Sequence, residues 1–441
     1  MTISILWFRR DLRLADHPAL LAAVDSSDEV LPVFVRDPVL LARGGVRAER
    51  LEASLAALSA DTGGALIVRT GEPAAVIAEL AETVGADQVH VSRESTPYGR
   101  RRGDRVRRAL AGDGRELVET GSPYAVGPGR VLNKSGEPYR VFTPFARAWH
   151  DHGWPEPGDR PDDISWAADP DSGASEDVDP GRGGAGRGGE AGEQAALARW
   201  REFLHEDLTS YGDQRDRPDL DTTSRLSVHL KYGEIHPRTI LAELADHPGS
   251  DSEGARRFVT ELAWREFYAD VLWHRPRSAW RDLRDTLEGM DYDEGPETAA
   301  LRQLRAEGWM HNRVRMVTAS FLVKDLHVWW PSGARYFLDH LRDGDLASNN
   351  HGWQWVAGTG TDASPYFRVF NPVTQGVKFD PDGDYVRRWI PELAHLSGAA
   401  AHEPWRAADG YDHGYPERIV DHAEERRETL RRYDRARGDG S

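Results

Sequence analysis

The chain has 441 residues, a length that predicts two or more domains, each with a full-sized core. It contains no cysteine, which excludes disulfide bonds, thiolate zinc sites and Cys-ligated iron–sulfur clusters and is typical of a reducing compartment. The net charge of −17 argues against nonspecific binding of nucleic acid by bulk charge, so any such binding must depend on local charge.

The first residues do not have the pattern of a targeting segment. They are apolar over too short a stretch for a signal peptide, and basic residues follow this stretch instead of preceding it. No apolar run approaches the ~20 residues that a helix needs to span a bilayer. We therefore expect a cytoplasmic protein without a membrane anchor.

The N-terminal part of the chain alternates strand-like and helix-like patterns. Runs rich in Val, Ile and Leu predict strands at Ile3–Phe8, Val30–Val35, Ala65–Arg69, Gln88–Ser92 and Glu116–Glu119. Helical apolar spacing lies between them at Asp16–Val24, Val46–Ala60, Pro73–Val84 and Arg102–Ala111. This alternation predicts an α/β domain over residues 1–130, with a doubly wound parallel sheet that helices cover on both faces.

Residues 131–195 are predicted to connect this domain to a second one. From residue 155 onward the connection is polar and of low complexity, which predicts disorder or a long surface loop. Beyond it the spacing is helical, and residues 196–441 are expected to form an all-helical domain. The expected helices are Gln194–Leu208, Pro237–Ala245, Glu253–His274, Glu297–Glu307, Arg313–Val328, Ala334–Leu341 and Pro416–Tyr433.

Two polar motifs in the helical part allow more than one interpretation. The hydroxyl and arginine cluster Thr222–Ser227 could hold a pyrophosphate at a helix start, or could only cap that helix. On the expected helix Glu253–His274, Glu261 and Trp264 lie one turn apart, beside Tyr268. They could present a stacking indole next to a carboxylate, or form part of an ion-paired helix with a core tryptophan.

A third region, from Asn312 to Phe379, is dense in Trp, Asn, Arg and Gly. Arg315 and Asp343 could pair there if their helices are adjacent, and a flavin ring could satisfy their remaining polar atoms. No metal site is expected, because His311 has no second ligand at i+4. The sequence also lacks a nucleophile elbow, a Walker loop and a zinc-protease motif, which favours chemistry carried by a bound cofactor.

Together these motifs resemble those of the DNA photolyase/cryptochrome family, and most closely its branch that repairs cyclobutane pyrimidine dimers. The resemblance covers nearly the whole chain outside the low-complexity segment. The segments that carry it are Leu6–Leu14, Thr223–Ser227, Trp264–Tyr268, Gly308–Arg313, Asp343–Asn350, Gly352–Trp355 and Phe370–Pro372. It implies an α/β antenna domain, a long linker and an all-helical FAD-binding domain.

The resemblance also implies the residues that line the flavin. These are Tyr211, Thr223, Ser224, Arg225, Leu226, Ser227, Phe258, Arg315, Asp343, Gly344, Asp345 and Asn349. Asn349 would lie at the flavin N5 atom. An amide is a poor proton donor, so this position favours the anionic reduced FAD that repair requires. A second antenna chromophore, a deazaflavin or a folate, is a further family possibility.

For the reaction, the resemblance implies light-driven electron transfer from excited reduced FAD to a cyclobutane pyrimidine dimer. Base flipping is a known property of photolyases and is taken over with the resemblance. Trp264 and Trp355 would sandwich the flipped dimer, and Glu261, Asn312 and Met316 would contact its bases. Arg215, Arg313 and Gln375 would contact the DNA strand. Glu261, Asn349, Trp330 and Trp353 are the expected catalytic residues, the two tryptophans as members of a relay that reduces the flavin.

The sequence departs from the family pattern between Tyr292 and Leu304, where it is shorter and lacks the outer relay tryptophan; Tyr292 is the nearest candidate.

Two other functions remain as alternatives. One is a blue-light photoreceptor that signals through a protein partner, which the short segment after Pro416–Tyr433 disfavours. The other is repair of the second pyrimidine photoproduct, which two cavity histidines usually support, whereas Asn312 and Met316 stand here. The expected partner is damaged DNA, bound by a monomer without metal or membrane.

Overall fold

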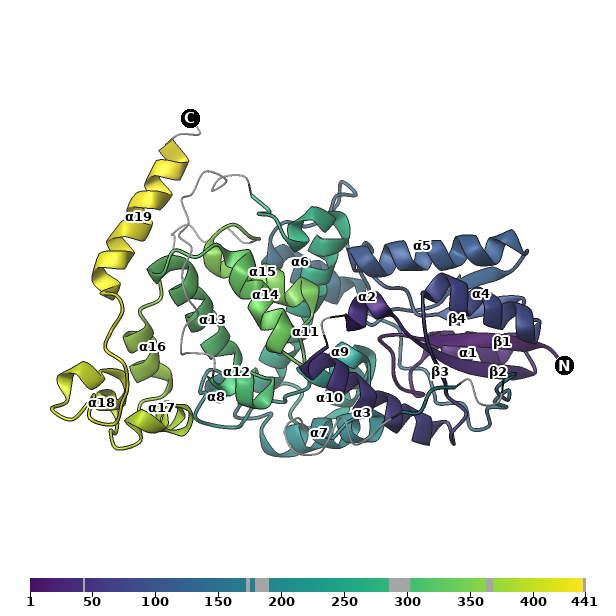
Figure 1. Cartoon of the computed structure of the whole chain (residues 1–441), viewed down its shortest axis with the longest axis horizontal. Helices are drawn as coiled ribbons and strands as arrows, with labels where there is room; N and C mark the ends of the chain where they lie inside the picture. The colour runs from purple at the N-terminus through teal and green to yellow at the C-terminus, as the bar shows by residue number, and fades with distance from the viewer. Residues whose placement is uncertain (43, 172–174, 179–189, 285–301, 362–367, 439–441) are drawn as a thin grey trace.

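The computed structural model describes residues 1–42, 44–171, 175–178, 190–284, 302–361 and 368–438. Its strands are β1 (Ile3–Phe8), β2 (Glu29–Arg36), β3 (Ile67–Thr70), β4 (Gln88–Val91) and β5 (Glu116–Glu119). They form one parallel sheet in the order β3-β2-β1-β4-β5 (Figure 1). The predicted fold class, a doubly wound sheet followed by a helical part, is therefore confirmed.

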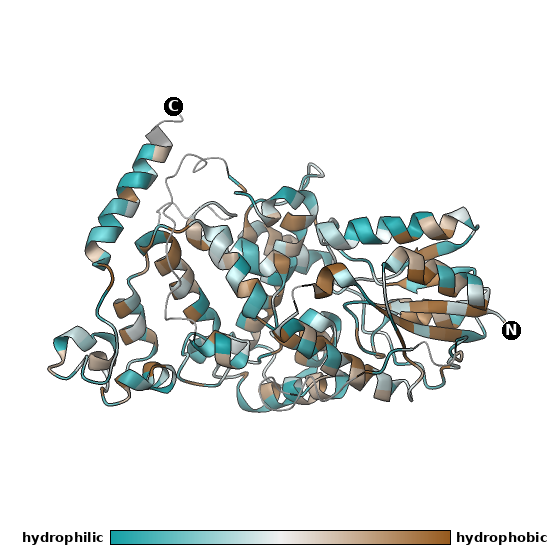
Figure 2. Cartoon of the chain, viewed as in Figure 1, coloured by the Kyte–Doolittle hydropathy of each residue, from teal (hydrophilic) through white to brown (hydrophobic). Residues whose placement is uncertain are grey.

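Helices cover both faces of the sheet because successive side chains of each strand point to opposite sides. From β1, Ile5 and Trp7 enter one core with α4 (Pro73–Val84) and α5 (Pro97–Gly112). Leu6 and Phe8 enter the other core with α1 (Pro18–Ser26) and α3 (Val46–Asp61). Strands buried on both faces have continuous apolar runs, as the brown sheet in Figure 2 shows.

The helical half lies to the left of the sheet in Figure 1, and the last helix projects from it. A short helix, α2 (Pro38–Leu41), precedes α3 in the α/β half. The helices from residue 142 onward are α6 (Phe142–His152), α7 (Glu193–Glu206), α8 (Tyr211–Gln214), α9 (Ser227–Tyr232), α10 (Pro237–Asp246), α11 (Glu253–His274), α12 (Arg302–Glu307), α13 (Asn312–Ser320), α14 (Trp330–His340), α15 (Leu346–Ala357), α16 (Pro372–Phe379), α17 (Asp384–Trp389), α18 (Ala399–His402) and α19 (His422–Gly438). None of the described helices is long and apolar enough to cross a membrane.

The helix predicted at Arg313–Val328 is confirmed in its first part but is not a single α-helix to Val328. Helix α13 ends at Ser320 and continues as one π-helical turn, Phe321–Asp325. The wider turn changes the direction of the side chains that follow, and two buried charged groups find partners there. Lys324 Nζ donates to the Arg368 carbonyl oxygen, and the Asp325 carboxylate pairs with His422 of α19.

Of the two possibilities predicted for residues 155–195, disorder does not hold for part of the segment, which is a loop bonded to the sheet. The Val30 N–H donates to the Ser165 carbonyl oxygen at 2.9 Å, and the Ala167 N–H donates to the Val30 carbonyl at 2.9 Å. Farther on, the Glu176 N–H bonds the Val68 carbonyl, also at 2.9 Å. Backbone bonding to β2 and β3 thus fixes a stretch whose composition is that of a loop. Residues 172–174 and 179–189 lie outside the described part.

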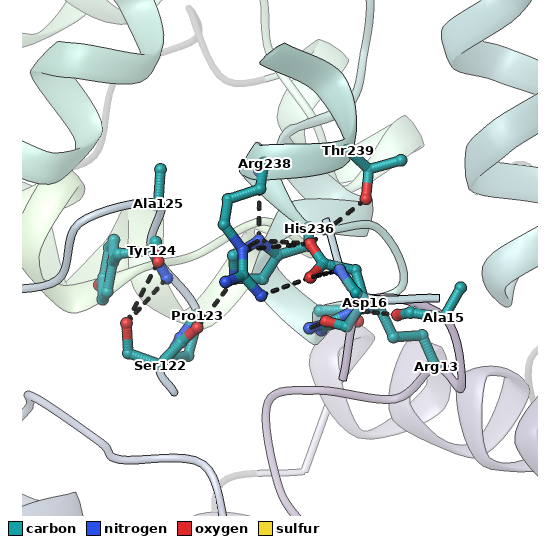
Figure 3. A network of polar contacts seen from close by, with 12 residues as sticks. Arg13, Ala15, Asp16, Ser122, Pro123, Tyr124, Ala125, His236, Arg238 and Thr239 are labelled. Atoms are coloured by element: carbon teal, nitrogen blue, oxygen red, sulfur yellow. Dashed lines mark hydrogen bonds and ion pairs between the residues drawn. The ribbon is translucent and has the colours of Figure 1, made fainter. Parts of the chain in front are cut away.

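A buried polar network joins the loop after β1 to the start of α10 (Figure 3). Asp16 is 1% exposed and accepts hydrogen bonds from the Gly158 N–H at 3.0 Å and from Arg238 Nε at 3.3 Å. His236 Nδ1 lies 3.0 Å from the same carboxylate, and burial lowers the pKa of His236 to about 4. This network fixes the N-terminal loop against the helical half, which positions Arg10 of that loop for the site described next.

Candidate functional site

Most of the predicted site residues lie on helices that pack together. Helix α15 packs against α11, α13 and α14. Its start is set by Asp345, whose side chain accepts from the Ser348 N–H at 3.0 Å, and its end by Gly358 in the left-handed conformation (φ 87°). Glu261 and Trp264 lie on α11, Asn312 and Met316 on α13, and Asn349, Trp353 and Trp355 on α15.

The expected pair between Arg315 and Asp343 forms. Arg315 Nη2 donates to Asp343 Oδ2 at 2.8 Å, and Arg315 Nε donates to the Met310 carbonyl at 2.7 Å. Asp343 Oδ1 is buried and has no hydrogen-bond partner in the protein. A buried carboxylate oxygen without a donor is costly, so this atom is suited to accept from a ligand. A side-chain carbon at the neighbouring Gly344 would lie 3.1 Å from the Leu341 carbonyl oxygen, so the backbone is tightly packed here.

Asp345 has two basic neighbours that the sequence did not reveal. Arg10, from the loop after β1, donates from Nη2 to Asp345 Oδ2 at 2.8 Å. Burial alone would raise the pKa of the Asp345 carboxyl, but Arg10 and Lys231 hold it well below its usual range. Burial and the charge of Arg10 lower the pKa of Lys231 to about 7. The α/β half thus contributes directly to the site.

Arg199 of α7 fixes the backbone of the hydroxyl cluster before α9. Arg199 donates to the Thr223 carbonyl at 2.7 Å and to the Ser224 carbonyl at 3.0 Å. Arg225 has a left-handed backbone (φ 53°), which turns the chain sharply. The Thr222 hydroxyl is buried without a partner. No side chain makes a cap hydrogen bond at the start of α9, so the capping role considered for this cluster is not seen there.

Two members of that cluster differ in their exposure. Leu226 is 1% exposed and belongs to the apolar core of the helical half, so its side chain packs internally. Ser227 is exposed and begins α9. The same core contains Tyr211 and Phe258, whose ring centroids lie 5.8 Å apart. Burial raises the pKa of Tyr211 well above its ordinary value.

Asn349 has both amide protons engaged. Its Nδ2 donates to the Ala334 carbonyl of α14 at 3.0 Å and to Asn350 Oδ1 at 2.8 Å. Asn350 in turn donates to the Ala279 carbonyl. A primary amide has two N–H donors and one carbonyl acceptor, so the side-chain oxygen is the atom of Asn349 left for a ligand.

The two predicted stacking tryptophans belong to different apolar clusters. Trp264 stacks on Phe142 of α6, with ring centroids 3.6 Å apart and planes 7° from parallel. Trp355 packs with Met316 on the cluster built from α13, α14 and α15. Phe142 was not predicted as a site residue, although it supports one face of the Trp264 indole. Only the tertiary packing of α6 on α11 reveals its role.

The basic residues expected to contact DNA are paired with acids. Arg215 donates to Glu261 at 2.6 Å, and Arg313 lies 2.7 Å from Asp216. The Arg313 guanidinium also lies 4.3 Å from the centre of the Phe379 ring at the end of α16. Asn312 is exposed at the start of α13, and Gln375 lies on α16.

The two tryptophans expected to form the relay lie in one apolar cluster. Trp330 is fully buried, and its indole N–H donates to Asp282 Oδ1 at 2.7 Å. Trp353 is 4% exposed and meets Phe337 edge to face, with centroids 4.9 Å apart. Tyr292, the candidate for the outer position, lies outside the described residues.

A separate, partly open hollow lies beyond the carboxyl ends of β4 and β5. Arg93, Glu119 and Tyr124 line it from the α/β side, and His236 and Trp273 line it from the helical side. Ligands of doubly wound sheets commonly bind outside the carboxyl ends of the strands, so this position is suited to a second flat ligand.

Comparison with known proteins extends over both halves of the chain. Residues 4–162 match the sequence model described as DNA photolyase, and residues 258–435 match the FAD binding domain of DNA photolyase. A deoxyribodipyrimidine photo-lyase of Streptomyces griseus is 42% identical, over 99% of this chain and 100% of that protein. A solved class III photolyase from Agrobacterium tumefaciens is 35% identical, with a TM-score of 0.91, over 99% of this chain and 98% of its own. A Synechocystis cryptochrome is 25% identical, with a TM-score of 0.87, over 98% of this chain and 99% of its own. The whole-length likeness to these proteins and the two matched sequence models establish that this chain belongs to the DNA photolyase family.

Proposed function

We propose that this protein uses light to repair cyclobutane pyrimidine dimers in DNA, with reduced FAD as its resident cofactor. The observation that carries the proposal is the convergence of α11, α13 and α15 on one site, in a chain that is similar over its whole length to a deoxyribodipyrimidine photo-lyase. On excitation, bound reduced FAD supplies the electron that splits the dimer and takes it back afterwards. The reaction is therefore that of a carbon–carbon lyase.

The free polar atoms of the site fit a flavin nucleotide. The Thr222 hydroxyl and Asp343 Oδ1 are buried without protein partners, and Asn349 has one carbonyl oxygen to offer. Arg10 and Arg315 compensate the two aspartates, so the site needs no metal to balance their charge. We assign the predicted flavin residues to this site, and we add Arg10 and Lys231 as charge partners of Asp345.

Asn349 is assigned the control of the proton near the flavin N5 atom. Since both of its N–H groups are donated to protein oxygens, this side chain offers an acceptor and no proton. That property favours the anionic form of the reduced cofactor, which is the stronger electron donor.

Trp264 and Trp355 are assigned the contact with the extruded dimer. Phe142 fixes the plane of Trp264, which lowers the entropy cost of stacking a base on it. Arg215 and Arg313 must exchange their acidic partners, Glu261 and Asp216, for DNA phosphates or lesion atoms. We therefore expect binding to weaken as salt concentration rises.

Three finer assignments are part of the proposal. A second chromophore would bind in the hollow near Trp273, and the protein would act as a monomer in the cytoplasm.

A blue-light photoreceptor is the other candidate, since the Synechocystis cryptochrome has a similar fold. The enzyme is preferred because identity to the Streptomyces griseus photo-lyase is 42%, against 25% for that cryptochrome.

The dimer-binding assignment predicts that Trp264→Ala and Trp355→Ala each weaken binding to a thymine-dimer oligonucleotide by roughly 1–3 kcal/mol, the usual contribution of one base–aromatic stack. Both variants should still bind FAD. The measurement is fluorescence anisotropy with damaged and undamaged oligonucleotides, beside the absorption of bound flavin. Trp405→Ala, a half-buried tryptophan outside the site, is the control. Unchanged affinity in both site variants would remove the sandwich assignment.

A further inference from the structure

Two consecutive tryptophans at the start of α14 lie in opposite environments. Trp329 is 45% exposed, whereas Trp330 is 0% exposed. Among the exposed large apolar side chains of the described residues, Trp329 is the only aromatic one. The Cα atoms of consecutive residues are about 3.8 Å apart across a trans peptide bond, so a surface tryptophan and a core tryptophan are neighbours along the backbone here.

The buried indole is close to a third one, on α15. Trp330 and Trp353 belong to the same apolar cluster, and α14 packs against α15. Gly333, one turn after Trp330, is in contact with the Trp353 ring, because an added Cβ there would clash with its outer carbons. Trp353 in turn lies one helical turn after Asn349. The indoles thus lead from solvent to the proposed flavin site.

Asp282 makes the middle indole easier to oxidise. Its carboxylate accepts the Trp330 N–H at 2.7 Å in a partly buried hydrogen bond, and the Trp330 side chain itself is fully buried. A negative charge this close to an indole stabilises the positive charge left when that indole loses an electron, and it does so more strongly away from water. A radical cation on Trp330 is therefore stabilised until a donor at the surface reduces it.

We infer that Trp329 is the surface entry point for electrons that reduce the flavin under light, by way of Trp330 and Trp353. This inference rests on the proposed function and on the relay roles that the family resemblance implies for Trp330 and Trp353. Trp353 gives one electron to the excited oxidised flavin, Trp330 refills Trp353, and Trp329 refills Trp330. A small thiolate in solution gives one electron to Trp329 and becomes a thiyl radical, and two such radicals join as a disulfide. Each indole returns to its starting state, and one electron per thiolate ends on the flavin.

The test compares Trp329→Phe with wild type, both loaded with oxidised FAD, in laser-flash absorption with dithiothreitol as the thiol. In wild type, the tryptophan radical should decay faster as dithiothreitol increases. In Trp329→Phe, this dependence should be lost, and the yield of flavin reduction under steady light should fall several-fold. Trp329→Tyr keeps an oxidisable ring at the surface and should restore the thiol dependence in part. Trp405→Phe, far along the chain, should behave as wild type.

The inference would be overturned if the Trp329→Phe protein kept the wild-type thiol dependence of radical decay and the wild-type yield of flavin reduction. It would also be overturned if Tyr292→Phe lost both properties and Trp329→Phe did not. Failure of the underlying relay has a different signature, namely normal flavin reduction in Trp330→Phe and Trp353→Phe. Dimer repair by the chemically reduced Trp329→Phe protein should equal that of wild type, because that reaction needs no electron from solvent. An equal loss of repair and photoreduction would instead indicate damage to the flavin site and would also overturn the inference.

Discussion

At the scale of single residues, the site depends on which polar atoms the protein leaves unbonded. Asp343 Oδ1 and the Thr222 hydroxyl are buried without partners, and Asn349 has only its carbonyl oxygen free. The Arg315–Asp343 pair was predicted on the condition that the two segments are adjacent, and the two groups lie 2.8 Å apart. Arg10 and Lys231 could not be predicted, because a contact with Asp345 across the whole chain depends on how the two halves are joined.

Asn349→Asp should change the protonation of the reduced flavin. A carboxyl group at this position can supply a proton that the amide cannot, so illumination should produce the neutral flavin radical with its long-wavelength absorption. Visible spectroscopy during illumination measures this change. Asn133→Asp is the matched control, because Asn133 already accepts from the Ser135 and Glu137 N–H groups with its side-chain oxygen. Identical spectra for Asn349→Asp and wild type would contradict the role assigned to Asn349.

At the scale of helices and strands, the sequence predicted those elements whose apolar residues recur with a clear period. The strands and the long helix α11 have strong apolar periodicity, and α11 was predicted with its observed bounds, Glu253–His274. Helix α15 was missed because Ser348, Asn349, Asn350 and Gly352 are weak helix formers. Its cap at Asp345, its end at Gly358 and its packing on three helices determine it instead. Packing likewise determines the π-helical turn after α13, where buried Lys324 and Asp325 find their partners.

At the scale of the whole molecule, the function depends on the connection between the two halves. The strand order β3-β2-β1-β4-β5 could not be predicted, since pairing between distant strands leaves no local signal. Glu234 is one buried residue that connects the two halves. Its carboxylate accepts hydrogen bonds from Arg50 of α3 at 2.6 and 2.8 Å. It also lies 2.6 Å from His229 of α9 and accepts a hydrogen bond from the Gly192 N–H before α7. Although burial raises the pKa of Glu234, His229 and Arg50 lower it to about 2.

The low pKa of Glu234 predicts how stability depends on pH. Because the folded-state pKa lies below the ordinary value of 4.5, the stabilising contribution is complete above pH 4.5 and is lost as pH falls toward about 2. Glu234→Gln should cost roughly 3–5 kcal/mol at neutral pH, and the difference from wild type should shrink on acidification. Urea unfolding between pH 7 and 3 measures both effects. The half-exposed Glu243 pairs with Arg201 at 3.3 Å, and Glu243→Gln should change stability by less than about 0.5 kcal/mol. A Glu234→Gln deficit that stays constant with pH would contradict this account.

The central claim is that this fold positions reduced FAD against a pyrimidine dimer in DNA. The most direct test is to reduce the FAD-loaded protein chemically, add an oligonucleotide with one thymine dimer, and follow loss of the dimer by chromatography in blue light and in the dark. We predict that the dimer disappears only in light and that the spectrum of the reduced flavin is the same before and after. An unchanged amount of dimer after illumination, in a sample whose spectrum shows bound reduced flavin, would contradict the claim.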